Sequence, residues 1–191
     1  MSKAVLISIR PQWCEKIVNG EKTIEVRKTR PKLQTPFKCY IYCTMDHPYI
    51  SVSCAELDKL NYRTNTVGRC NGKVIGEFVC DCVTPLYNVC MDDWKRLSGG
   101  LHNIEKELVN QACLTEAKLH TYAGGKNCFA WHISDLRIYD TPKELSEFKT
   151  LCRVDADCCA CPYYNYTKMD CDGRVIGRPP QSWCYVDDAN A

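Results

Sequence analysis

The chain has 191 residues, of which 45% are hydrophobic and 25% are charged. This composition is typical of a globular protein, and the length suits one domain or one domain with a small appendage. The net charge of +2 excludes a strong positive electrostatic field over the whole protein that would attract nucleic acid. The apolar runs are much shorter than a membrane span, and Arg10 ends the first of them too early for a signal sequence. We therefore expect a cytoplasmic protein with no membrane segment.

The N-terminal part of the chain predicts a strand, a helix and a second strand. Residues 4–9 form a continuous apolar run, which is typical of a buried strand. Pro11 suits the first position of a helix, and Gly20 would end that helix. Residues 23–27 alternate between polar and apolar side chains, as in a strand with two different faces. Further strands are predicted at residues 38–43 and 73–82, with a long polar loop at 46–72 between them.

The second half of the chain adds helices late in the order of elements. Helices are predicted at residues 91–97, 103–113 and 116–122, the last with Thr115 as its N-cap and an end at Gly124. Residues 128–139 predict a strand, and Thr141-Pro-Lys-Glu144 has the pattern of a capping box for a helix that runs to about residue 149. Strands and helices do not alternate regularly, so the sequence predicts an α+β fold, a small mixed β-barrel with flanking helices.

Lys22, Glu25 and Arg27 are the most informative charged residues, because they lie close together at the start of a predicted strand. Between Lys22 and Lys38 there are six basic residues and one acid, Glu25. A positive patch of this kind can bind phosphate groups. We expect Arg30 to be part of this patch. The alternatives are a solvated loop and an exposed ion pair between Glu25 and Arg27.

The chemistry of these side chains favours binding over proton abstraction. Arg27 can form two parallel hydrogen bonds to a phosphate or to a base edge, and Glu25 can orient Arg27 or accept from an exocyclic amine. Lys22 would act as a base only if its pKa were depressed, and a neighbouring carboxylate has the opposite effect. Trp13 offers a stacking face or belongs to the core.

The residues that surround this string carry a resemblance to a known family. Leu6-Ile-Ser-Ile-Arg-Pro11, Trp13 and the string Gly20-x-Lys22-x-x-Glu25-x-Arg27 resemble the opening of an ASCH domain, of the PUA-like superfamily. Residues 72–78 and 129–133 resemble its central and closing strands, so that the resemblance covers about residues 4–140. It implies a PUA-like mixed β-barrel, a cleft beside the first helix and an RNA-related function.

The resemblance also implies an alternative activity. A few members of the ASCH family are enzymes, namely hydrolases of acylated cytidine and ribonucleases, and a lysine of this string is catalytic in the hydrolase branch. Lys22 occupies its place, but Glu25 stands where that branch has a threonine. Residues 178–186 resemble tails of phage and prophage members. We accordingly predict an ASCH domain at residues 1–149 and a cysteine-rich extension at residues 150–191.

The extension contains several of the 16 cysteines of the chain. Cys158 and Cys161 have the spacing of one arm of a zinc knuckle, and Cys171 and Cys184 can supply the second pair of ligands. A structural zinc ion would supply folding energy to a tail with few apolar residues. Cys152 or Cys159 could replace one of the four ligands, and the competing interpretations are an iron–sulfur cluster and free thiols.

The sequence thus predicts a protein that binds RNA, single-stranded DNA or a nucleotide-like ligand. The predicted ligand-binding residues are Trp13, Lys22, Glu25, Arg27 and Arg30. One alternative is a hydrolase of modified nucleosides or a nuclease, with Lys22 and Glu25 as catalytic residues. Another is a phage factor that binds a host protein. The sequence alone does not decide whether the protein is an enzyme.

Overall fold

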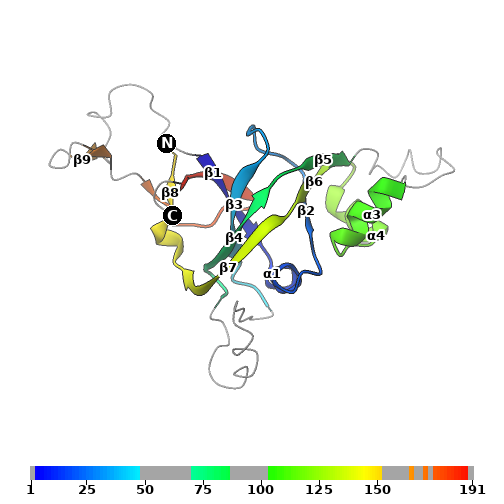
Figure 1. Cartoon of the computed structure of the whole chain (residues 1–191), viewed down its shortest axis with the longest axis horizontal. Coiled ribbons are helices and arrows are strands. Elements are labelled where there is room, and N and C mark those ends of the chain that lie inside the picture. The colour runs from blue at the N-terminus through cyan, green and yellow to red at the C-terminus, as the bar shows by residue number, and fades with distance from the viewer. Residues whose placement is uncertain are drawn as a thin grey trace, which may run out of the picture.

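The structure, a computed structural model, describes residues 3–47, 70–86, 103–151, 164–165, 170–171 and 174–188. In these residues strands predominate and helices are few (Figure 1), which confirms the mixed α+β composition expected from the sequence. No helix of the described part is long and apolar enough to cross a membrane.

Seven strands form the larger sheet, in the order β11-β8-β12-β1-β3-β4-β7. The pairing of β1 with β3 is parallel, and the other pairings in this sheet are antiparallel. The strands are β1 (Lys3–Ile9), β3 (Phe37–Cys43), β4 (Val74–Cys80), β7 (Ser134–Lys143), β8 (Lys149–Thr150), β11 (Arg174–Val175) and β12 (Trp183–Asp187).

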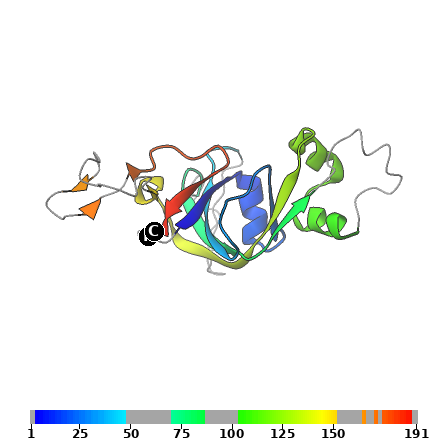
Figure 2. The same ribbon diagram turned by 90° about the horizontal axis from the view of Figure 1, so that it is seen from above.

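A smaller antiparallel sheet has the order β2-β6-β5. Helices α3 and α4 lie at its end of the molecule (Figures 1 and 2) and pack on one of its faces. A separate short pair joins β9 to β10. The bounds are β2 (Ile24–Arg27), β5 (Val83–Leu86), β6 (Cys128–His132), β9 (Tyr164–Asn165), β10 (Asp170–Cys171), α1 (Pro11–Val18), α3 (Asn103–Gln111) and α4 (Glu116–Ala123).

The helix ends follow the local signals in the sequence. Pro11 is at the first position of α1, and Gly20 follows the helix with a φ of +74°, a conformation that glycine adopts without strain. In α4 the side chain of Thr115 accepts a hydrogen bond from the backbone N–H of Lys118 at 3.2 Å. Gly124 ends α4 in the left-handed conformation, with a φ of +58°.

Replacing Thr115 by Ala should lower the free energy of unfolding by about 1 kcal/mol, because the first turn of α4 loses an acceptor for its N–H groups. Chemical denaturation followed by circular dichroism measures this loss. Thr121→Ala is the matched control on the same helix, since the Thr121 hydroxyl only donates back to the carbonyl of Ala117. Equal losses in the two variants would show that the cap contributes nothing.

Trp131 of β6 occupies the centre of the main core, between the two sheets. It is fully buried, and its ring centroid lies 5.8 Å from that of Phe37 in β3 and 6.0 Å from that of Trp183 in β12. The core also takes the inward side chains of β1 and the buried face of α1, including Ile17. The smaller sheet, the larger sheet and the first helix therefore share one apolar core.

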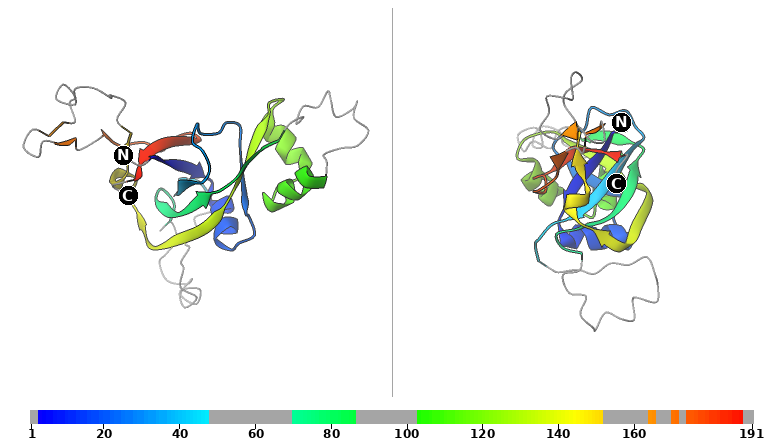
Figure 3. Two further views of the ribbon diagram at one scale, coloured as in Figure 1. Left: turned by 45° about the horizontal axis from the view of Figure 1, so that its top comes forward. Right: turned by 90° about the vertical axis from the view of Figure 1, so that its left-hand side faces the viewer.

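Strand β12 lies inside the larger sheet, between β8 and β1, as Figures 2 and 3 show. It pairs with β1 along its whole length, from Lys3 opposite Asp187 to Ile7 opposite Trp183. Residues 174–188 belong to the segment that the sequence analysis assigned to an extension. They contribute two strands, β11 and β12, to the main sheet.

Two predictions about the late elements are wrong in detail. Residues 128–139 form two strands rather than one, with a break at Ile133 between β6 and β7. The helix predicted from Thr141 is absent, because β7 continues to Lys143 as the last strand of the sheet, where its proline is tolerated. The capping box starts at Glu144 instead and begins a single 3-10 turn, Leu145–Glu147. The helix predicted at residues 91–97 and most of the loop predicted at 46–72 lie outside the described residues.

Candidate functional site

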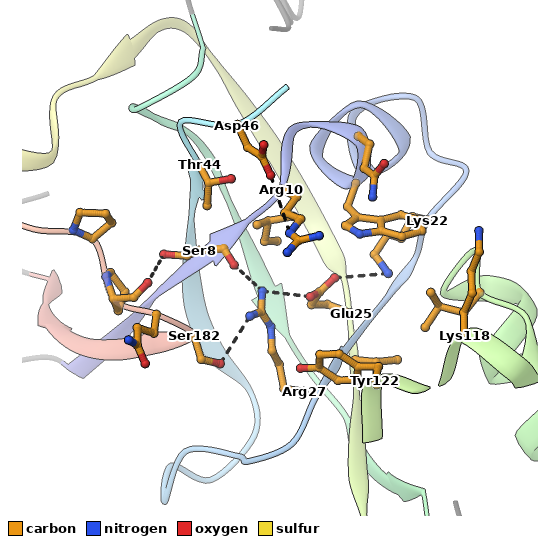
Figure 4. A pocket seen from close by; sticks show the side chains of 18 of the residues that line it. Ser8, Arg10, Lys22, Glu25, Arg27, Thr44, Asp46, Lys118, Tyr122 and Ser182 are labelled. Atoms are coloured by element: carbon orange, nitrogen blue, oxygen red, sulfur yellow. Dashed lines mark hydrogen bonds and ion pairs between the residues drawn. The ribbon is translucent and has the colours of Figure 1, made fainter. Parts of the chain in front are cut away.

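A cleft of about 850 Å³ opens where α1, β2, α4, the ends of β1 and β3 and the segment before β12 meet (Figure 4). Lys22, Glu25 and Arg27 lie on its floor, and all three side chains are more than nine-tenths buried. The cleft lining contains four basic side chains (Arg10, Lys22, Arg27 and Lys118) and two acidic ones (Glu25 and Asp46), so it carries an excess of positive charge.

The alternation of β2 explains why charged side chains reach the floor. Ile24 and Val26 point to an apolar cluster with α3 and α4, whereas Glu25 and Arg27 point to the cleft. This alternation confirms the two-faced strand predicted from the sequence. Because the Glu25–Arg27 pair is buried, the alternative of an exposed ion pair is wrong.

Glu25 is held between two cations. Its Oε2 lies 3.2 Å from Lys22 Nζ, and its Oε1 lies 3.0 Å from Arg27 Nη2. Figure 4 shows the three side chains in line across the floor, with the carboxylate in the middle. Each oxygen of the carboxylate therefore has one cationic partner and retains a further lone pair.

Lys22 has an acceptor for each of its three ammonium protons. In addition to Glu25, it donates to the carbonyl oxygens of Ile24 at 2.7 Å and Ala112 at 2.8 Å. The ammonium also lies 5.3 Å from the centroid of the Trp13 ring, in a cation–π contact. Three fixed acceptors and one aromatic ring therefore hold the Lys22 side chain in place on the floor.

Arg27 joins the floor to two segments that are far apart in the sequence. Its Nη2 donates to the carbonyl oxygen of Ser8 in β1, and its Nη1 donates to the hydroxyl of Ser182 at 3.4 Å. Ser8 in turn donates through its own hydroxyl to the carbonyl of Pro180 at 2.6 Å. The C-terminal segment is thus fastened to the floor as one wall of the cleft.

Two buried polar atoms of the cleft lining have no hydrogen-bond partner within the described part of the protein. They are Nε of Arg27 and Oγ1 of Thr44. An unpaired buried polar group costs about 1–3 kcal/mol, so such groups call for an explanation such as water or a ligand. Their position in lining residues favours the cleft as a place where a polar molecule binds.

The rim of the cleft is more exposed and carries further cations. Arg10 lies at one side, where its Nε is 3.9 Å from Asp46 Oδ2, and Lys118 of α4 lies at the other. Tyr122 of α4 is 40% exposed and lines the cleft, and Lys28 Nζ lies 5.3 Å from its ring centroid. The rim therefore combines basic side chains with an accessible aromatic ring.

The structure brings together four of the five predicted ligand-binding residues. Trp13, Lys22, Glu25 and Arg27 line the cleft, whereas Arg30 is exposed on the loop after β2 and does not line it. Trp13 lines the cleft and also packs against the main core, and its use as a stacking face stays a prediction. Sequence reasoning missed the contributions of Ser8, Lys118, Tyr122 and Ser182 to this site.

The predicted zinc site falls largely outside the described residues. Cys158 and Cys161 are not among them, and the side chain of Cys171 is not described. Cys184 packs beside the apolar cluster of β1 and β3, and burial raises the pKa of its thiol to about 11. Within the described residues, no group of three or more His, Cys, Asp and Glu side chains is placed to hold a metal ion. The zinc site stays a prediction.

Comparisons with known proteins give likenesses of structure only. No protein-family model matches the sequence, and no curated protein matches it. The chain is similar to the crystal structure of an ASCH protein from Zymomonas mobilis, with a TM-score of 0.48 and 18% sequence identity over 98% of this chain and 90% of that one. A Tyr-to-Phe mutant of the same bacterial protein gives a TM-score of 0.47 at 17% identity, with 98% and 92% of the two chains covered. A Ser-to-Ala mutant gives 0.47 at 19% identity, with 98% and 90% covered. With TM-scores below 0.5, membership of the ASCH family remains a prediction from the sequence motif.

Proposed function

We propose that the protein is an ASCH-type, PUA-like domain that binds RNA, single-stranded DNA or a nucleotide-like ligand in the cleft around Lys22, Glu25 and Arg27. The observation that supports this proposal best is the buried carboxylate of Glu25, held between an ammonium and a guanidinium on the floor of an open cleft of about 850 Å³. Clefts of this size bury most of a small organic ligand, and a few fixed polar groups orient it.

The floor and the rim suit different parts of such a ligand. On the floor, the charges of Lys22 and Arg27 are partly balanced by Glu25, and most of their protons already have acceptors. Few donors remain there for a phosphate. On the rim, Arg10 and Lys118 can meet phosphates in solvent, and the Tyr122 ring offers a face on which a base can stack. We place the base on the floor side and the phosphates at the rim.

The geometry weighs against the hydrolase or nuclease alternative in which Lys22 is catalytic. A lysine that acts as a base or nucleophile must lose a proton, whereas Lys22 donates to three fixed acceptors and faces a carboxylate. Proton abstraction by Lys22 would first require it to leave these partners. The binding role needs no such rearrangement.

The proposal predicts a strong dependence of binding on salt. The affinity for a labelled ten-nucleotide single-stranded RNA of mixed sequence, measured by fluorescence anisotropy, should fall steeply between 50 and 200 mM NaCl. Each phosphate contact contributes a slope of about −0.7 in a plot of log affinity against log salt. Lys118→Ala should therefore reduce the slope by about 0.7.

Lys106→Ala is the matched control, because Lys106 is an exposed lysine of the neighbouring helix α3 that does not line the cleft. It should leave both the affinity and the slope unchanged. Absence of RNA binding at low salt would remove RNA from the proposed ligands, and binding with no salt dependence would contradict the contacts between the rim and phosphates. A flat salt response would instead favour a small ligand or a protein partner.

A further inference from the structure

The hydrogen-bonding groups left free on the cleft floor form a specific pattern. All three ammonium protons of Lys22 have acceptors, so Lys22 offers nothing to a ligand. Nη2 of Arg27 is taken by Ser8 and Glu25, while Nη1 makes one long bond to Ser182 and keeps a second proton free. Glu25 keeps one free lone pair on each oxygen. The floor thus presents two adjacent acceptors on Glu25 and a free Nη1 proton on Arg27, whose buried Nε–H also has no partner among the described residues.

We propose that Glu25 is the specificity-determining residue of the cleft and that it reads the Watson–Crick edge of guanine. This inference rests on the proposed function. Guanine presents one acceptor, O6, followed by two adjacent donors, the N1–H and the N2 amino group. The two donors match the two oxygens of Glu25, and O6 matches the free Nη1 proton of Arg27. A second lone pair of O6 can accept from the Ser182 hydroxyl, which lies beside Arg27 Nη1.

The other bases leave groups on this floor unmatched. Cytosine and uracil each present two acceptors and one donor group, the reverse of what Glu25 and Arg27 require. Adenine presents one donor and one acceptor, so one carboxylate oxygen keeps its desolvated lone pair. An unmatched buried carboxylate oxygen is costly, because the ligand removes the water it would otherwise bind. A phosphate is also disfavoured there, since it would meet the negative charge of Glu25 at close range.

The decisive experiment measures the binding of labelled RNA pentamers that differ only at the central base. Four pentamers carry G, A, C or U between flanking uridines, and a fifth carries inosine, which has the O6 and N1–H of guanosine but lacks the amino group. Lithium chloride buffer prevents association of the guanine strands. The guanosine pentamer should bind about tenfold or more tightly than the uridine pentamer. Inosine should lose about fivefold to tenfold relative to guanosine.

Glu25→Gln tests the same assignment from the side of the protein. Gln presents one acceptor and one donor, so the ratio of guanosine to uridine affinity should fall to about one. The inosine comparison uses the unaltered protein and decides the matter even if this variant does not fold. Equal binding of all pentamers, a preference for another base, or no difference between guanosine and inosine would overturn the role of Glu25 and leave the proposed function intact. Failure of every pentamer to bind would overturn the guanine assignment and also remove RNA from the proposed function.

Discussion

Replacing Glu25 by Ala should lower the free energy of unfolding by about 3–5 kcal/mol, as expected when one partner of a buried ionic group is removed. The carboxylate lies between Lys22 and Arg27, and the three side chains are 3–9% exposed. Without it, two cations remain buried close together with no counter-charge. Urea denaturation followed by circular dichroism, with the native chain measured in parallel, gives the loss directly.

Two comparisons separate this effect from a general cost of losing an ion pair. Lys16 and Glu21 form a shorter pair, at 2.6 Å, but both side chains are exposed. Glu21→Ala should therefore cause no comparable loss, because water screens and replaces that pair. In addition, a triple variant with Met, Leu and Met at positions 22, 25 and 27 should be more stable than Glu25→Ala, since it leaves no charge unpaired. Similar losses for Glu21→Ala and Glu25→Ala would contradict the buried ionic cluster.

Replacing Trp131 by Ala should also cost about 3–5 kcal/mol, the usual range for a large aromatic side chain removed from a core. Trp131 is fully buried and contacts the rings of Phe37 and Trp183, so its loss leaves a cavity between the two sheets. Trp183 directly follows Ser182, the partner of Arg27. If the protein binds RNA as proposed, the variant should weaken that binding as well as stability, and both can be measured on the same preparation.

Trp131→Phe is the informative companion variant. It retains an aromatic ring in the core and removes the buried indole N–H, which has no hydrogen-bond partner in the part of the chain that the structure describes. It should therefore be clearly more stable than the alanine variant.

Tyr122→Ala is a control that removes an aromatic ring that is 40% exposed. Its effect on stability should be much smaller than that of Trp131→Ala. A mild effect of Trp131→Ala would show that the two sheets do not depend on this residue.

Local signals in the sequence were sufficient for the elements that carry the floor of the cleft. Pro11 and Gly20 bound the first helix, and the alternation of residues 23–27 places Glu25 and Arg27 on one face. Such signals act over a few residues, because helix caps and strand alternation depend on the backbone immediately around them. The convergence of Lys22, Glu25 and Arg27 follows from their short separation along the chain.

The walls of the cleft could not be predicted in the same way. Ser182 meets Arg27 across 155 positions of sequence, and it does so only because β12 pairs with β1. Tyr122 and Lys118 reach the cleft because α4 packs against β2, which is a property of the tertiary structure. The failure at Thr141 has a similar origin, since pairing of β7 with β4 overrides the local helix signal.

The position of β12 has a consequence for the order of events during synthesis. One wall of the cleft, including Ser182, is built by residues that precede β12, and this strand can add to β1 only after residue 187 has left the ribosome. A nascent chain that ends before this point has Lys22, Glu25 and Arg27 but no complete cleft around them. The cleft is therefore completed only after β12 has been made, although the three charged residues of its floor are among the first to be synthesised.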